Sequence, residues 1–519
     1  MKSGKSPLLL FALCTALLSP VWLAAQSANS EHKEHSGHQS RYKLIDLGTL
    51  GGPHSYGEIN GDGIPLLNNA GIVGSYADTA NPDPNTPNCA VPDCFLAHAF
   101  RWKDGVITDI GALPGVNFSA AGSTNARGWM AGQSSSSIID PNFGVQEGRA
   151  VLWKNGSIVD LGDLPGGTES LSVYVNDSGQ VVGFSDNGVP DENSFFFFPT
   201  GTQIRTFLWE NGTMRDIGTL GGASAVPGVN CSGQPRNVLV GASFLNGTSN
   251  AATGVPTVEP FLWKDGVMTD LGSLGGTLGF AQCPNYRGQI IGNSDLSGDV
   301  NFHAFLWENG SMTDLGTLGG PNSEAIWINH AGLIVGSADL PGENLHDAVV
   351  WKDGKIIDLG TLYGDACSRG RGLNARGQVV GGSSDCRNFL HAFIWEEGGS
   401  MQDLNTLIAA GSGWQLTNAF NINDRGEILA KAAPVGFTPN DDEDLGHLVL
   451  LVPCDDASES SCGADSKAAA GAPAQNATQA GIRGAGTDFT PRARTPKENV
   501  AAWRARFAKQ YHLPTPRKN

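Results

Sequence analysis

The motif DLGTLGG, or a close variant of it, recurs eight times along this 519-residue chain and constrains the fold more than any other feature. The last four copies begin 44, 44 and 45 residues apart, whereas insertions lengthen the earlier intervals. The copies begin at Asp46, Asp109, Asp160, Asp216, Asp270, Asp314, Asp358 and Asp403. A repeat of this period is typical of a propeller, a solenoid or another array of small supersecondary units.

One repeat unit, residues 314–357, contains four short apolar runs. The first two runs flank the turn Asn329-His330-Ala331-Gly332, and the last two flank Asp353-Gly354. Asn at the first position of a tight turn accepts a backbone hydrogen bond, and Gly at the fourth position tolerates a positive φ. Asp-Gly between apolar runs is a strong hairpin signal. Each unit therefore predicts a four-stranded antiparallel meander.

The two ends of the repeat region are complementary. Residues 42–48 match only the fourth run of a unit, and residues 447–453 match the third run, with no fourth run after them. A propeller closes when its first strand completes its last blade, whereas an open solenoid needs polar caps instead. We therefore predict that residues 42–453 form an all-β, closed β-propeller of eight four-stranded blades. Seven blades or a β-solenoid are the alternatives.

The flanking segments differ in composition from the repeats. Residues 1–25 combine a positive start, a short apolar core and small residues, which predicts a signal peptide and therefore an extracellular or periplasmic location. Residues 26–41 are predicted to be a His-containing disordered leader, and residues 454–490 a flexible linker. Residues 491–519 predict a basic amphipathic helix that docks on the propeller or on an anionic surface. No second apolar run is long enough to span a membrane.

The overall charge narrows the class of partner. The formal net charge is −18, and nucleic-acid binding requires a positive surface because phosphates dominate the affinity. The charge therefore argues against a general nucleic-acid binder. The expected partner is a protein or a glycan.

Three motifs that recur in register carry a family likeness. They are HAFLW at 303–307, DLGTLGG at 314–320 and the hairpin INHAGLIVGS at 328–337. Together they resemble the HAF-repeat family of bacterial extracellular proteins. The resemblance implies export and a propeller-like repeat array, and it supplies no catalytic residues.

Eight of the nine cysteines follow the predicted signal peptide. An even number of cysteines in an exported chain predicts disulfides, and the lack of a CxxC pair argues against zinc. The predicted bridges are Cys89–Cys94, Cys231–Cys283, Cys367–Cys386 and Cys454–Cys462.

The glycine-rich motif itself is not expected to bind a phosphate. A phosphate-binding loop needs a Lys and a Ser or Thr before a helix, whereas Gly319-Gly320 leads into another strand. We therefore predict a joint between blades and no cofactor. The acidic run at 440–444 could attract a structural calcium ion, but it lacks the ligand spacing of a calcium loop, and a solvated turn is the favoured interpretation.

Residues with the same rank in every unit are expected to be structural. The recurrent Trp is assigned to the core between blades, and the repeat-derived His98, His303 and His391 to blade edges. Positions where the copies differ are better site candidates. On the first strands of their units, Arg369, Arg371 and Trp327 are predicted to line the central channel.

No nucleophile elbow, HExxH helix or other catalytic signature occurs in the sequence, so no catalytic or metal-binding residue is predicted. The favoured hypothesis is a secreted scaffold that binds protein or carbohydrate at its loop face or channel mouth. The alternative is an extracellular hydrolase or lyase whose site is assembled from several blades at the channel mouth.

Overall fold

A computed structural model describes most of the repeat region and little of its flanks. The described residues are 42–57, 63–86, 89–115, 118–139, 146–194, 201–229, 235–342, 345–436, 445–454 and Thr495. The predicted signal peptide, leader and acidic run lie outside these residues, as do Cys231, Cys462 and almost all of the predicted linker and tail helix. In the described part of the chain, no helix combines the length and the apolar character needed to cross a membrane.

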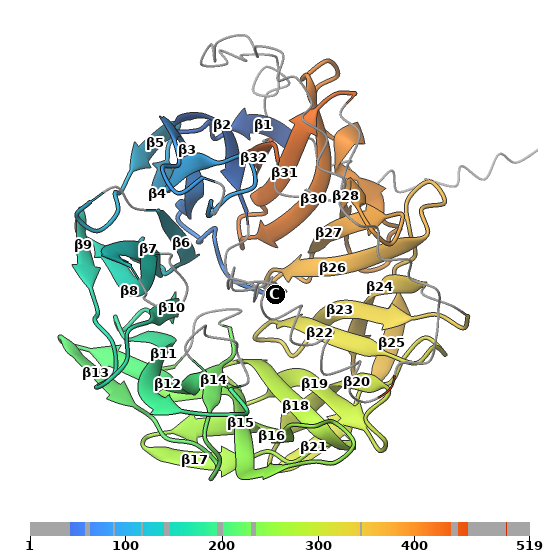
Figure 1. Ribbon diagram of the computed structural model, residues 1–519. Coiled ribbons are helices and arrows are strands. Elements are labelled where there is room, and N and C mark those ends of the chain that lie inside the picture. Colours follow the sequence, from blue (N-terminus) through green and yellow to red (C-terminus); the bar gives the residue numbers. More distant parts are fainter. Residues whose placement is uncertain are drawn as a thin grey trace, which may run out of the picture. The chain divides into compact units, whose positions relative to one another are not determined.

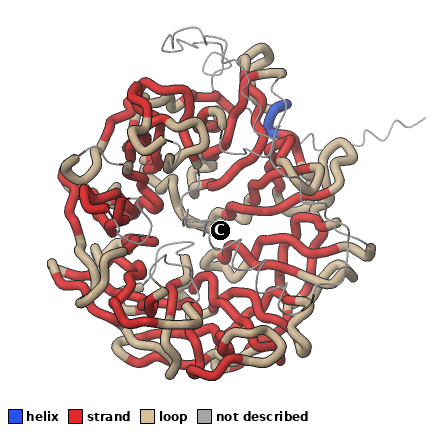
Figure 2. Tube along the Cα trace, viewed as in Figure 1, coloured by secondary structure: helices blue, strands red, loops and turns tan. Residues whose placement is uncertain are grey.

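The described chain is all-β (Figure 2), and its one helical element there is the 3-10 turn η1 (Leu404–Thr406). Its strands form six four-stranded sheets and one eight-stranded sheet. A single parallel residue pair, Val258 with Leu278, joins β16 to β18 in the larger sheet. Apart from this bridge, the larger sheet consists of two more four-stranded antiparallel units. We number the units as sheets 1 to 8 in chain order.

Sheet 1 contains β2 (Gly51–Tyr56), β3 (Val73–Pro82), β4 (Phe95–Lys103) and β5 (Val106–Asp109). Sheet 2 contains β6 (Ser119–Thr124), β7 (Met130–Ile139), β8 (Gln146–Lys154) and β9 (Ser157–Asp160). Sheet 3 contains β10 (Ser170–Val175), β11 (Val181–Pro190), β12 (Thr202–Glu210) and β13 (Thr213–Asp216). Sheet 4 contains β14 (Ala225–Pro227), β15 (Val238–Ser249), β16 (Pro256–Lys264) and β17 (Val267–Asp270).

Sheet 5 contains β18 (Gly275–Pro284), β19 (Ile290–Leu296), β20 (Phe302–Glu308) and β21 (Ser311–Asp314). Sheet 6 contains β22 (Ser323–Ile328), β23 (Ile334–Asp339), β24 (His346–Lys352) and β25 (Lys355–Asp358). Sheet 7 contains β26 (Cys367–Leu373), β27 (Val379–Ser384), β28 (Phe389–Trp395) and β29 (Gln402–Asp403). Sheet 8 contains β30 (Trp414–Ile422), β31 (Ile428–Pro434), β32 (His447–Pro453) and β1 (Tyr42–Asp46).

The last sheet is built from both ends of the repeat region (Figure 1). Strand β1 pairs antiparallel with β32, so that Tyr42 lies opposite Pro453 and Asp46 lies opposite Val449. The prediction that the opening strand completes the last unit is therefore confirmed. The predicted four-stranded antiparallel unit is confirmed as well.

The recurrent turn Asn shapes its own hairpin and also contacts the neighbouring sheet. In sheet 6, Oδ1 of Asn329 accepts hydrogen bonds from the N–H groups of Ala331 and Leu333. Its Nδ2 donates to the backbone carbonyl of Asn374, in the corresponding turn of sheet 7. The same donation links Asn68 to Asn125, Asn125 to Asn176, Asn285 to Asn329, Asn374 to Asn423, and Asn423 back to Asn68. We call these residues the Asn ladder.

The DLGTLGG motif is a joint between sheets, as predicted. Its Asp accepts a hydrogen bond from the glycine two residues later, for example Asp314 from the N–H of Gly316 at 2.7 Å. A Ser on the first strand of the next sheet accepts a hydrogen bond from a backbone N–H group on the third strand of the preceding sheet. The Ser323 hydroxyl, for example, accepts from the N–H of Ala304. In the same way Ser55 of sheet 1 accepts from the N–H of Leu448 in sheet 8. Sheet 8 thus contacts sheet 1 as the other sheets contact their successors.

The recurrent Trp lies in the core at six of its seven positions, and Trp307 is half-buried. The indole N–H of Trp351 donates to the backbone carbonyl of Leu315, in the joint that precedes its sheet. The predicted core role of this residue is therefore confirmed, and the indole also holds the joint in place.

Candidate functional site

The three predicted channel-lining residues have different environments. Trp327 is 6 % exposed and Arg371 is 5 % exposed, so neither offers its side chain to solvent. The Arg371 guanidinium lies over the rings of Phe389 and Phe420, at 5.4 and 5.1 Å from their centres. It therefore holds sheets 7 and 8 together. Of the three residues, Arg369 alone keeps a partly exposed side chain, at 27 %.

Arg369 forms an ion pair with a residue of the preceding sheet. Its Nη2 lies 2.9 Å from Oε2 of Glu324, whose side chain is 26 % exposed. Both residues are on the first strands of their sheets, β26 and β22, which contact each other (Figure 1). Side chains alternate between the two faces of a strand, so register places further residues on the Glu324 side of sheet 6.

Two of these further residues are Asp339 and His346. They lie opposite each other in the β23–β24 ladder, and Glu324 lies opposite Ser337 in the β22–β23 ladder. Residues directly opposite share one face of an antiparallel pair, as do residues two apart along a strand. Glu324, Asp339 and His346 therefore share a face, and Arg369 reaches Glu324 from sheet 7. We call these four residues the Arg–His cluster.

Hydrogen bonds fix one carboxylate of the cluster. Oδ2 of Asp339 accepts from Nδ2 of Asn322 at 2.8 Å and from its backbone N–H at 3.1 Å. Burial raises the pKa of the Asp339 carboxyl, and the two bonds from Asn322 oppose this effect. The Asp339 carboxylate thus anchors the start of β22, the first strand of sheet 6.

The histidine of the cluster is neutral at physiological pH. Burial, reinforced by the positive charge of Arg369, lowers the pKa of His346 to about 4, although the Glu324 carboxylate opposes the shift. A neutral imidazole can accept a proton, and a guanidinium fork can bind or neutralise a carboxylate. The cluster therefore combines a neutral imidazole with a guanidinium that is paired with Glu324, at a partly exposed position.

Sequence reasoning identified Arg369 and missed the other three members. His346 lies one residue before Asp347, which takes the place of the motif histidine, and no other copy has a histidine at this preceding position. Glu324 is the second residue of β22, on the same strand as Trp327. Both positions depart from the repeat consensus. Their convergence depends on strand register, which the repeat alone does not give.

The repeat-derived histidines lie at sheet edges and pair with carboxylates. Nδ1 of His98 lies 2.9 Å from Asp109, and Nδ1 of His303 lies 2.9 Å from Asp314. In both sheets the Asp belongs to the DLG motif. His391 instead lies 2.9 Å from Asp365, because the Asp403 carboxylate caps η1. The first two pairs clasp the third and fourth strands of their sheets, whereas the third ties β28 to the joint before β26. All three roles are structural.

Two sheets have an acid at the histidine position. Glu259 in sheet 4 and Asp347 in sheet 6 are buried and face the motif carboxylates Asp270 and Asp358. Burial, followed by repulsion from Asp270, raises the pKa of Glu259 to about 7. Burial and Asp358 raise the pKa of Asp347 to about 6. Both pairs therefore take up protons on folding.

Replacing Glu259 by Gln is expected to stabilise the protein at high pH. A folded-state pKa raised above the unfolded value contributes stability at low pH that is lost as pH rises through about 7. The gain in unfolding free energy should be near zero at pH 4 and about 3 kcal/mol at pH 8. Chemical denaturation across this range measures it, with the exposed Glu192→Gln as control. A gain independent of pH would contradict the expectation.

A second polar cluster lies beneath the first insertion and is nearly closed to solvent. The Tyr56 hydroxyl lies 2.9 Å from Oδ1 of Asp78 and 3.3 Å from Oδ1 of Asp93. Tyr56 and Asp78 are 1 % and 0 % exposed. Burial, reinforced by Asp93, raises the pKa of Asp78 to about 8. This cluster fastens the insertion to sheet 1 and offers a substrate little access.

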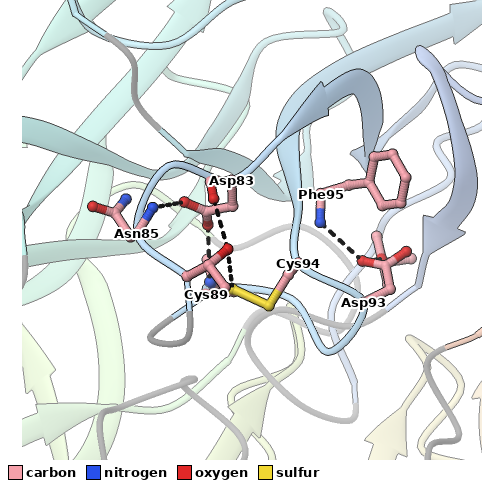
Figure 3. Close-up of a disulfide and its surroundings, with 9 residues drawn as sticks. Asp83, Asn85, Cys89, Asp93, Cys94 and Phe95 are labelled. Carbon is pink, nitrogen blue, oxygen red and sulfur yellow. Dashed lines mark hydrogen bonds between the residues drawn. A yellow bond between two sulfur atoms is a disulfide. The ribbon is translucent and has the colours of Figure 1, made fainter. Parts of the chain in front are cut away.

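One disulfide closes the first insertion, and another closes the β26–β27 hairpin. The Cys89–Cys94 bridge ties the loop that carries Asp93 (Figure 3), and the Cys367–Cys386 bridge joins the start of β26 to the loop after β27. Both bridges are among the four predicted pairs. Cys283 and Cys454 are also disulfide-bonded. Within the described ranges, no group of three or more His, Cys, Asp and Glu side chains is arranged to hold a metal ion.

Comparisons with known proteins identify no family and reveal distant structural similarity. No family model and no curated protein matches the chain. Its structural neighbours include propeller-type hydrolases, lyases and sialidases, all weakly matched. A Pyrococcus horikoshii acylaminoacyl peptidase matches with a TM-score of 0.38 and 12 % identity, covering 73 % of this chain. The chain spans 58 % of that peptidase.

Two further solved structures cover most of both chains. A polysaccharide lyase, an ulvan lyase bound to -[GlcA(1-4)Rha3S]-, has a TM-score of 0.32 and 10 % identity, covering 67 % of this chain and 94 % of its own. A Trypanosoma rangeli sialidase in complex with the inhibitor DANA has a TM-score of 0.28 and 9 % identity, covering 79 % of this chain and 95 % of its own. These similarities transfer no activity to this chain.

Proposed function

We propose that the chain is an exported lyase that cleaves an acidic polysaccharide at the Arg–His cluster. The observation that carries the proposal is the meeting of a neutral His346 with the Arg369–Glu324 ion pair at a half-exposed junction of two sheets. A pure binding scaffold, which the sequence favoured, requires no such base. We also propose that sheets 1 to 8 are the blades of a closed eight-bladed propeller of the HAF-repeat type.

The chemistry of a lyase suits these groups better than hydrolysis. A glycosidase needs two carboxyl groups placed on either side of the scissile bond. Here Glu324 is paired with Arg369, and Asp339 is bonded to Asn322. Elimination needs a base and a positive charge beside the substrate carboxylate, which the cluster contains.

The proposed reaction proceeds by proton abstraction. The His346 imidazole takes the proton from the carbon that bears the carboxylate of a uronic-acid residue. The electron pair forms a double bond to the neighbouring carbon, whose bond to the glycosidic oxygen breaks. The departing oxygen takes a proton from water. Arg369 stabilises the negative charge that develops on the carboxylate during proton removal.

A panel of uronic-acid-containing and neutral polysaccharides tests the proposal. The purified protein should release products with an unsaturated sugar from at least one acidic polymer, detected by ultraviolet absorbance and mass spectrometry. His346→Gln should lose at least about a hundredfold in rate. His303→Gln, which removes a repeat-derived histidine, should keep full activity. Saturated products, no products, or equal rates for the two variants would refute the proposal.

A further inference from the structure

Two aromatic rings are held against histidines on neighbouring sheets. Tyr363, in the joint before β26, packs against His391 in a T-shaped arrangement with ring centres 5.2 Å apart. Trp414, at the start of β30, packs against His447 with ring centres 4.8 Å apart. Each histidine is in turn paired with a carboxylate, His391 with Asp365 and His447 with Asp46. Sheets 7 and 8 contact each other through β28 and β30 (Figure 1).

Tyr363 is an outlier in backbone conformation and in exposure. It replaces the first of the paired glycines in the joint and adopts φ +53°, a region that bulky residues rarely occupy. Its side chain is nonetheless 70 % exposed, so core packing does not explain the choice. A residue that costs backbone strain and gains little burial is a candidate for function.

The Tyr363 ring is also fixed in place. The neighbouring Asp403 side chain interacts with the Tyr363 hydroxyl, and His391 packs against part of the ring. Desolvation and the Asp403 interaction raise the pKa of the phenol. The remaining ring surface is open. Trp414 remains half-exposed while part of its ring packs on the core of sheet 8. Rigid aromatic rings bind with little loss of conformational entropy, so both are preorganised contact surfaces.

We infer that Tyr363 and Trp414 form a binding platform for an extended saccharide chain. The apolar face of a sugar ring stacks on an aromatic ring, and nearby carboxylates accept bonds from sugar hydroxyls. Asp46, whose side chain is 31 % exposed beside His447, is the carboxylate available for such a bond. Two rings on neighbouring sheets suit a ligand several sugar units long. The inference rests on the proposed function and assigns the platform to the polymer beyond the cleaved bond.

The platform also lies at the end of the sheets that carries the Arg–His cluster. Tyr363 precedes β26, whose third residue is Arg369. Both are therefore near the start of the first strand of sheet 7. A polymer bound across sheet 7 would meet the cluster at one end of β26 and the platform at the adjoining joint.

Tyr363→Gly separates binding from folding. Glycine accepts a positive φ without strain, so thermal stability should be unchanged or higher. Affinity for the polysaccharide, measured by gel retardation in the inactive His346→Gln background, should fall about three- to tenfold. Tyr286→Ala is the matched control, because Tyr286 is 53 % exposed and packs on His330 at the opposite, Asn-turn end of the sheets.

The outcomes distinguish the platform from the active site. In the active protein, Tyr363→Gly should raise KM for the polymer and leave cleavage of short oligosaccharides unchanged. Binding without cleavage would refute the proposed function and keep the platform. Equal losses for Tyr363→Gly and Tyr286→Ala, no polysaccharide binding, or a proline-rich peptide as the ligand of these rings would overturn the platform.

Discussion

Replacing Arg369 by Gln is expected to lower kcat/KM on an acidic polysaccharide by about 10² to 10³. The guanidinium is the one positive charge of the Arg–His cluster, and Nη2 already lies 2.9 Å from Glu324. Without it, the carboxylate of the substrate would meet Glu324 unshielded. Arg369→Lys should lose less, because it keeps the charge and lacks the planar fork.

The stability of the same variants separates catalysis from folding. Removing one partner of the Arg369–Glu324 pair leaves a half-exposed charge, which costs about 1 kcal/mol. Arg369→Gln combined with Glu324→Gln should recover that loss without recovering activity. Arg236→Gln, which breaks the exposed Arg236–Glu210 pair, is the control and should leave kcat/KM unchanged. Full activity in Arg369→Gln would show that Arg369 has no part in catalysis.

Replacing Asn374 by Ala is expected to cost about 3 kcal/mol of unfolding free energy. Asn374 is 3 % exposed and accepts two bonds within its turn, from the N–H groups of Arg376 and Gln378. Its amide also donates to the carbonyl of Asn423 in sheet 8. The substitution leaves buried groups of both sheets unpaired. Urea denaturation measures the loss, and Arg376→Ala at an exposed site of the same turn is the control.

Asn423→Ala extends this prediction to the ends of the repeat region. Its amide donates to Asn68, 355 residues away along the chain. If sheets 8 and 1 are joined as firmly as sheets 7 and 8, the two Asn variants should lose similar amounts of stability. A clearly smaller loss for Asn423→Ala would mean that the closing contact is weak in solution.

The sequence predicts much of this fold because each joint and hairpin is specified locally. The turn Asn and Gly set the first hairpin, and Asp353-Gly354 sets the second, with φ of +50° and +72°. Residues 42–48 matched a fourth strand, and β1 indeed pairs with β32. These features depend on a few adjacent residues, so they can be read without knowing the neighbouring sheets.

The site could be predicted only in part, because bulges disturb the alternation of side chains. Strict alternation puts Arg369 and Arg371 on the same face of their strand. A register shift between Gly370 and Gly372 breaks the alternation in β26, and another between Ala325 and Trp327 does so in β22. Each bulge inserts an unpaired residue and re-aims the side chains beyond it. Arg371 and Trp327 are consequently buried, and Arg369 remains at the half-exposed junction.

The pH dependence of kcat/KM tests most directly the claim that a neutral His346 accepts the substrate proton. Free-enzyme kcat/KM reports the pKa of the essential base. Because the pKa of His346 is lowered to about 4, activity should stay level from neutral pH down to about pH 5 and fall as pH passes through about 4. The residual activity of His346→Gln should lack this acid limb. A limb near the ordinary histidine pKa of about 6.5, or one that survives in His346→Gln, would contradict the claim.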